Sequence, residues 1–133
     1  MVGATVGLVA IPGAMPPPAI LKRAPGIIAN TRRMQQSGVR VVAGTDAGIA
    51  PVKPHDVLRY AIPQLVDLGM TPADALITVT SVAAQVCGLA TTKGRIAQGY
   101  DADILAIAGD PFTELDAIHR IRAAYSRGRL VTG

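Results

Sequence analysis

The stretch Val39–Gly48, Val-Arg-Val-Val-Ala-Gly-Thr-Asp-Ala-Gly, combines a short β-branched run with a glycine stop and one carboxylate. Its four apolar residues in five positions, bounded by Gly38 and Gly44, predict a parallel β-strand that is covered on both faces. Ligands of α/β folds gather at the carboxyl ends of such strands, and Asp46 follows this end. A carboxylate there can bind a cation or accept a proton. The alternative is that Asp46 forms an Asx turn or caps the next helix.

Length and composition favour one α/β domain or part of one. The chain has 133 residues, of which 50% are hydrophobic and 3% aromatic, so aliphatic side chains must build the core. The net charge of +4 comes from scattered arginines without interleaved aromatic residues, which argues against nucleic-acid binding. The single cysteine, Cys87, is expected to be a small buried residue and suits a reducing cytoplasm. Residues 1–21 are uncharged, but their prolines and glycines argue against a membrane span or signal peptide.

The pattern before Asp46 predicts a parallel βαβ unit with a right-handed crossover. A strand over Ala4–Ala10 leads through a stiff, extended loop at Met15–Pro18 into a helix over Pro25–Gln36, and the Val39–Ala43 strand completes the unit.

The pattern after Asp46 predicts helices and then a β-rich tail. A helix opens near Pro54 with an apolar stripe over residues 57–66, and Pro63 is expected to kink or restart it. Two short helices follow, from Pro72 to about Val79 and from Ser81 to Gly88. The tail is expected to begin with two strand candidates in residues 93–108, of which Asp103–Ala108 is the clearer. A helical turn at Glu114–Ala117 and a hairpin that pairs Ile121–Tyr125 with Leu130 and Val131 are expected to follow.

Five motifs occur in order between residues 39 and 110: Val41-Val-Ala-Gly-Thr-Asp46, Gly69-Met-Thr-Pro-Ala-Asp-Ala-Leu76, Thr80-Ser-Val-Ala-Ala84, Gly94-Arg-Ile-Ala-Gln-Gly99 and Asp101-Ala-Asp-Ile-Leu105. Together they resemble the C-terminal part of the amidohydrolase superfamily, nearest to its imidazolonepropionase-like and Xaa-Pro dipeptidase-like branch. The resemblance implies the last strand–helix units of a (β/α)8 TIM-like barrel over residues 1–90. It further implies a β-rich segment of a composite sandwich over residues 91–133.

The resemblance also implies a chemistry. Such proteins are metal-dependent hydrolases that use metal-activated water, usually on zinc, to cleave amide, cyclic amide or peptide bonds in small-molecule or dipeptide substrates. Asp46 matches the aspartate that ends the eighth barrel strand, and so it is the candidate catalytic residue and metal ligand.

The family's histidine metal ligands are missing from this chain, whose only histidines are His55 and His119. His55 is a candidate substrate-binding residue at the barrel mouth, or it helps cap or solvate the helix start; His119 is expected at the surface. One aspartate cannot hold a catalytic zinc, so the chain alone is expected to bind no metal stably and to be inactive. The remaining ligands would come from an N-terminal portion or a complementing chain, and an unfinished barrel would favour self-association. The alternative function is a small noncatalytic α/β module that binds a partner chain through an open sheet edge.

Overall fold

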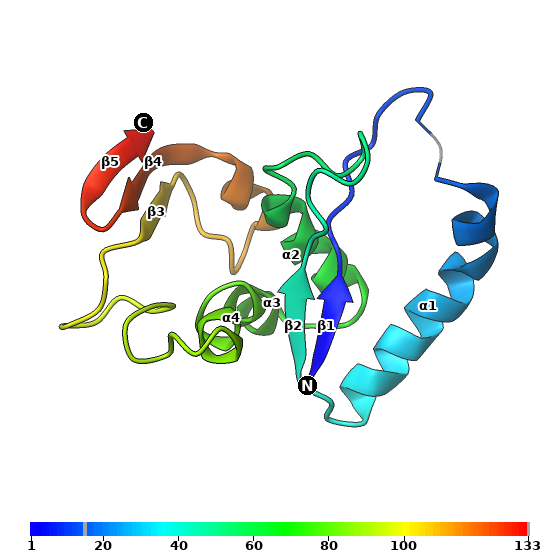
Figure 1. The fold of residues 1–133 in the computed structure, drawn as a ribbon, viewed down its shortest axis with the longest axis horizontal. Coiled ribbons are helices and arrows are strands. Elements are labelled where there is room, and N and C mark those ends of the chain that lie inside the picture. Colours follow the sequence, from blue (N-terminus) through cyan, green and yellow to red (C-terminus); the bar gives the residue numbers. More distant parts are fainter. Residues whose placement is uncertain (15, 133) are drawn as a thin grey trace. The chain divides into compact units, whose positions relative to one another are not determined.

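A computed structural model describes residues 1–14 and 16–132 as a mixed α/β chain. The described residues form two compact units, one up to residue 71 and the other over residues 72–132. Figure 1 shows the order of the elements along the chain. Met15, part of the stretch expected to be extended, lies outside the described residues. The assignment of residues 1–90 to a barrel and 91–133 to a sandwich stays a prediction.

The first unit contains the predicted parallel βαβ arrangement. Strand β1 (Val2–Thr5) pairs in parallel with β2 (Val41–Gly44), with Val2 opposite Val41 and Thr5 opposite Gly44 (Figure 1). β1 is earlier and shorter than expected, because Gly7 takes a φ of 85° that leaves the extended conformation. Complete coverage of β2 is not seen: Val41 is buried, whereas the rest of the strand is half-buried. In the described residues β2 has one neighbouring strand, β1.

Helix α1 (Pro18–Gln36) joins the two strands and begins seven residues before the predicted start. Proline is favourable in the first helical turn, where its missing N–H has no intrahelical partner, so the helix begins at Pro18 and continues through Pro25. The predicted end is confirmed, because Gly38 has a φ of 72° and its N–H donates to the carbonyl of Gln35 at 2.9 Å.

Helix α2 (Leu58–Asp67) follows β2 and buries one face. The buried side chains repeat at helical spacing and comprise Val57, Ala61, Ile62 and Leu65. The helix starts later than expected, after turns at residues 55–57, and it continues through Pro63 without a restart. Gln64 ties it to the chain after β1, since the N–H of Gly7 donates to the Gln64 Oε1 atom at 2.9 Å.

The second unit begins with the two short helices predicted for it, α3 (Pro72–Thr78) and α4 (Ser81–Val86). Gly88, with a φ of 73°, follows the end of α4. The prediction for Cys87 was wrong: it is a free, exposed thiol just after α4.

Three antiparallel strands complete this unit in the order β3-β4-β5. They are β3 (Ile104–Ile107), β4 (Ile121–Ser126) and β5 (Arg129–Thr132), with the 3-10 helix η1 (Leu115–His119) between β3 and β4 (Figure 1). The hairpin turn is confirmed: Arg127 and Gly128 both have positive φ, at 49° and 77°, as a type I′ turn requires. The strand expected near residue 93 is absent, because residues 91–100 form turns.

An ion cluster organises those turns. The Lys93 Nζ atom lies 2.7 Å from the Asp101 Oδ2 atom and also pairs with Asp103. Asp103 in turn accepts a hydrogen bond of 2.8 Å from the N–H of Arg127. The hydrogen bond donated by Lys93, and after it the one donated by the N–H of Arg127, lower the pKa of Asp103. The hydrogen bonds that the Lys93 ammonium donates to Asp101 and Asp103 raise the pKa of Lys93.

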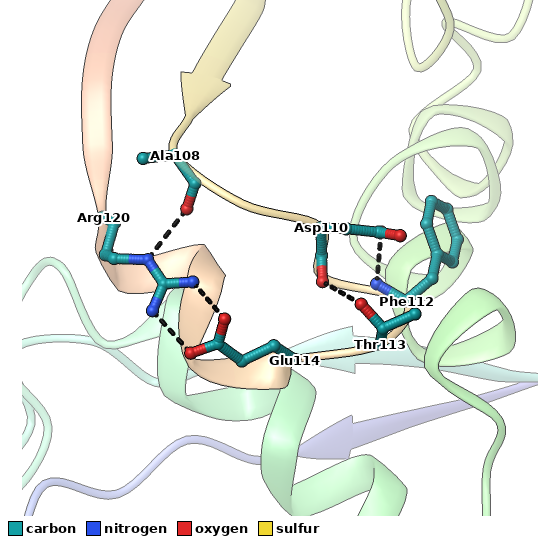
Figure 2. Close-up of polar contacts among 6 residues, drawn as sticks. All are labelled: Ala108, Asp110, Phe112, Thr113, Glu114 and Arg120. Atoms are coloured by element: carbon teal, nitrogen blue, oxygen red, sulfur yellow. Dashed lines mark hydrogen bonds and ion pairs between the residues drawn. The ribbon is translucent and has the colours of Figure 1, made fainter.

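A second cluster links β3, η1 and β4, and Figure 2 shows its contacts. Both terminal nitrogens of Arg120 bind the carboxylate of Glu114 at 2.6 Å, and its Nε atom donates to the carbonyl of Ala108 at 2.8 Å. Asp110 opens the turn that follows, because its carboxylate accepts the N–H of Phe112 at 2.9 Å. Arg120 makes its contacts while it stays exposed, and the arginines of the hairpin that follows, Arg122, Arg127 and Arg129, are exposed as well.

Across residues 1–14 and 16–132, no helix combines the length and the hydropathy that crossing a membrane requires.

Candidate active site

Asp46 lies two residues beyond the end of β2, and β1 ends beside β2 because the two strands are parallel and in register. Val6, the residue after β1, donates its N–H to the carbonyl of Gly44 at 2.8 Å, so the two strand ends remain in register. Asp46 is exposed and has a φ of 51°, a conformation that aspartate and asparagine tolerate better than most residues. The carboxylate is therefore carried by a turn at the carboxyl ends of both strands.

The loop after Asp46 closes on itself through main-chain hydrogen bonds. The N–H of Gly48 donates to the carbonyl of Lys53 at 2.6 Å, and the N–H of Ile49 donates to the carbonyl of Asp46 at 3.2 Å. An Asx turn at Asp46 would use the N–H of Gly48, which is engaged by Lys53. The N-cap position of α2 is Val57, so Asp46 does not cap that helix.

Lys53 is the residue that sequence reasoning missed. Its side chain is buried, with 8% of the residue exposed, and its Nζ atom donates to the carbonyl of Val6 at 3.2 Å. Burial lowers the pKa of Lys53, and the negative charge of Asp46 opposes part of that shift. The one available signal was that Lys53 is the single cationic side chain between Asp46 and Val57.

His55 shares the loop with Asp46 and is exposed. Its imidazole ring lies against Gly48, where an added Cβ atom would come within 3.0 Å of the ring's Cε1 atom. Gly48 has a φ of 87°, a backbone conformation that favours glycine, and an added side chain there would also push the His55 ring outward. The capping interpretation of His55 is not supported, because the N-cap of α2 makes no side-chain cap hydrogen bond.

An apolar cavity of about 540 Å³ adjoins this loop. It is lined by residues 8–12 together with Ala14, Pro16 and Val52. The N–H of Val9 donates to the carbonyl of Val52 at 2.9 Å, which joins the segment after β1 to the segment after β2. The segment that follows β1 is therefore joined to the loop that carries Asp46.

The residues present do not make a complete metal site. Within the part of the chain that the structure describes, no group of three or more His, Cys, Asp or Glu side chains is placed to hold a metal ion. A catalytic zinc takes about three protein ligands and keeps an open position. Asp46 supplies one carboxylate, and Asp56, the other carboxylate of the loop, pairs with Arg59. His119, the other histidine, lies in η1 of the second unit.

The chain matches known proteins over most of its length. The model of the amidohydrolase family matches residues 14–132. Imidazolonepropionase of Thermoplasma volcanium is 34% identical over 99 residues, which cover 71% of this chain and 24% of that protein. Imidazolonepropionase of Chromobacterium violaceum is 35% identical over 97 residues, which cover 72% of this chain and 21% of that protein.

A solved structure agrees with these relatives. The crystal structure of a Xaa-Pro dipeptidase with bound methionine in its active site is similar to this chain with a TM-score of 0.79 and 26% identity, over 87% of this chain and 28% of that one. The chain thus spans about a quarter of the length of the curated relatives it matches. On the family match over residues 14–132, the chain belongs to the amidohydrolase family.

Proposed function

We propose that this chain is the C-terminal part of a metal-dependent amidohydrolase that cleaves a carbon–nitrogen bond in a small-molecule or dipeptide substrate. The observation that carries the proposal is the position of Asp46, two residues beyond the end of a parallel strand in a chain of this family. In the proposal β1 and β2 are the last two strands of a (β/α)8 barrel, and the β-rich tail belongs to a composite sandwich. The alternative of a noncatalytic binding module is not favoured, since the relatives named above are enzymes.

In the complete enzyme Asp46 would supply one carboxylate oxygen, either as a ligand of a divalent metal, zinc in this proposal, or as the acceptor of a proton from the attacking water. When bound, the metal supplies the acidity of that water. Asp46 is exposed after the end of β2, and main-chain hydrogen bonds of the closed loop hold the backbone that carries its carboxylate.

His55 is proposed to bind substrate from the same loop, because its ring is exposed and packs on Gly48 two residues after Asp46. The apolar cavity beside the loop would accommodate an uncharged part of the substrate. By itself the chain is expected to hold no metal stably and to be inactive, with the missing ligands supplied by an N-terminal portion or a complementing chain. We further expect a cytoplasmic location, to which the single cysteine is suited.

A chimera tests the proposal. The aligned 99-residue segment of Thermoplasma volcanium imidazolonepropionase is replaced by the matching segment of this chain, and the zinc content and hydrolytic activity of the chimera are measured. Asp46→Asn is expected to lower kcat by roughly 10²–10⁴-fold, the contribution typical of a general base, and to reduce bound zinc. His55→Ala is expected to raise KM while leaving kcat unchanged.

The matched control is Asp67→Asn, which removes a carboxylate from the C-terminal end of α2 in the same unit. This variant is expected to retain activity and zinc. An Asp46→Asn chimera with the activity and metal content of its parent would contradict the role of Asp46. Zinc-dependent hydrolysis by the isolated 133-residue chain would contradict the proposal that it is incomplete.

A further inference from the structure

Lys53 is a buried cation that the proposed reaction does not use. Lysine is rarely buried without a partner, because the ammonium group loses its hydration. Here the residue is 8% exposed and its Nζ atom reaches the carbonyl of Val6, 47 positions earlier in the chain. An apolar side chain of similar length would fill the same volume without that cost, so the polar head requires an explanation.

We propose that Lys53 is a positioning residue of the candidate active site, whose ammonium group ties the loop that carries Asp46 to the carboxyl end of β1. The role of Lys53 in catalysis rests on the proposed function, whereas the hydrogen bond between Lys53 and Val6 can be tested without any reaction.

The main-chain hydrogen bonds of the loop show why a side-chain tie is needed. The bonds from Gly48 to Lys53 and from Lys53 to Ala50 close the loop on itself, but both partners of each bond belong to the loop. A loop closed in this way could still pivot as a unit at the end of β2. Among the described residues, two hydrogen bonds restrain the loop against the segment after β1. The N–H of Val9 donates to the carbonyl of Val52, and the ammonium group of Lys53 donates to the carbonyl of Val6.

The position of Lys53 makes its tie the more direct one for Asp46. Its carbonyl receives the N–H of Gly48, two residues after the carboxylate, while its ammonium holds Val6, whose own N–H binds Gly44 two residues before the carboxylate. Lys53 thus links Gly48, on the loop after Asp46, through its main-chain carbonyl, to Val6 at the end of β1, through its ammonium group. Attraction between the Lys53 and Asp46 charges favours the same arrangement.

The first test uses the wild-type chain labelled with ¹⁵N-lysine. The chain has three lysines, Lys22, Lys53 and Lys93, so NMR of the ammonium groups gives a small set of signals. Lys22 lies exposed on α1 and is the matched control. The ammonium protons of Lys53 are expected to exchange with water at least about tenfold more slowly than those of Lys22, since a hydrogen bond to a charged group slows opening. Equal exchange at the two residues would overturn the proposal.

The second test compares Lys53→Met, which keeps the apolar stem, with Lys53→Arg, which keeps a charged donor. Lys53→Met is expected to speed amide exchange at Gly48 and Val9 by roughly 10–100-fold, the equivalent of one charge-assisted hydrogen bond, and Lys53→Arg to restore much of the protection. The amide of Ala108, bound to the carbonyl of Arg120 in the second unit, should be unchanged. Unchanged exchange in Lys53→Met, or faster exchange in both units, would show that the stem serves only packing or general stability.

The third test connects the tie to Asp46 in the chimera. Lys53→Met is expected to lower kcat about tenfold with KM unchanged, because a misplaced catalytic group slows the reaction without weakening substrate binding, and Lys53→Arg should recover activity. A parental kcat in Lys53→Met would overturn the positioning role. The exchange measurements need neither metal nor catalysis, so failure of the proposed function and failure of this inference give different results.

Discussion

Replacing Gly94 by alanine should destabilise the second unit far more than replacing Gly99, the other glycine of the Gly94-Arg-Ile-Ala-Gln-Gly99 motif. The two residues have nearly the same φ, 89° and 86°, so alanine meets the same backbone strain of roughly 1–2 kcal/mol at each. Their surroundings differ. A Cβ atom at Gly94 would lie 2.7 Å from the Ala84 Cβ atom, 2.9 Å from the Ser81 Cα atom and 2.9 Å from the carbonyl oxygen of Thr80, whereas a Cβ at Gly99 meets nothing within 4 Å.

The overlap at Gly94 cannot be relieved by turning a side chain, because two of its three contacts are with the backbone at the start of α4. Overpacking of this kind costs roughly 1–3 kcal/mol. Gly94→Ala should therefore lower the free energy of unfolding by roughly 2–5 kcal/mol, and Gly99→Ala by roughly 1–2 kcal/mol. A loss of that size is a large part of the stability of a small unit.

Urea titration followed by NMR signals of amides in the second unit measures this difference. The amides of Leu89 and Asp101 are suitable probes, because they donate to the carbonyls of Ala84 and Thr92 at 2.8 Å. Equal losses for Gly94→Ala and Gly99→Ala would refute the argument from close approach. The double variant Gly94→Ala, Ala84→Gly should recover only part of the loss, since the two backbone contacts remain.

Two further outcomes follow from other contacts. Gly7→Ala should destabilise the first unit by roughly 2–5 kcal/mol, because Gly7 has a φ of 85° and the new Cβ atom would lie 2.8 Å from the carbonyl oxygen of Val57. Thermal unfolding measures this loss against the control Gly3→Ala, whose new Cβ atom meets nothing within 4 Å. Equal melting temperatures for the two variants would contradict the prediction. The hydrogen bonds from the Arg120 guanidinium lower the pKa of Glu114 below its ordinary 4.5. The contribution of ionised Glu114 to the free energy of unfolding is therefore fully present above pH 4.5, and it is lost as the pH falls through the lowered pKa. In Glu114→Gln, the free energy of unfolding, measured by urea titration between pH 2 and 7, should lose this dependence on pH. A pH dependence equal to that of the wild type would contradict the prediction.

The sequence predicted the elements whose signals are local. β2 was marked by its β-branched run and its glycines, and the hairpin by Arg127-Gly128, where glycine permits a positive φ. The sequence predicts a start of α1 at Pro25, because proline is typical of the first helical turn, but the helix begins at Pro18 and continues through Pro25. The strand expected near Lys93 was also wrong, because a lysine paired with two aspartates holds those residues in turns.

The candidate site could be predicted only in part, for a physical reason. Asp46 was identifiable because its position depends on the adjacent strand and on the resemblance of its motif. Lys53 was not, because its role depends on Val6, a residue 47 positions away that approaches it only in the folded chain. The same reason applies to the contact between His55 and Gly48, which requires the loop to turn back on itself.

The left-handed backbone at Asp46 limits which residues can occupy that position. Its φ of 51° favours glycine, asparagine and aspartate and disfavours β-branched side chains. Of these three favoured residues, only aspartate carries a charge. Backbone geometry and ionic chemistry are therefore both met by aspartate, and an amide substitution separates the two requirements because it changes the charge while keeping the geometry.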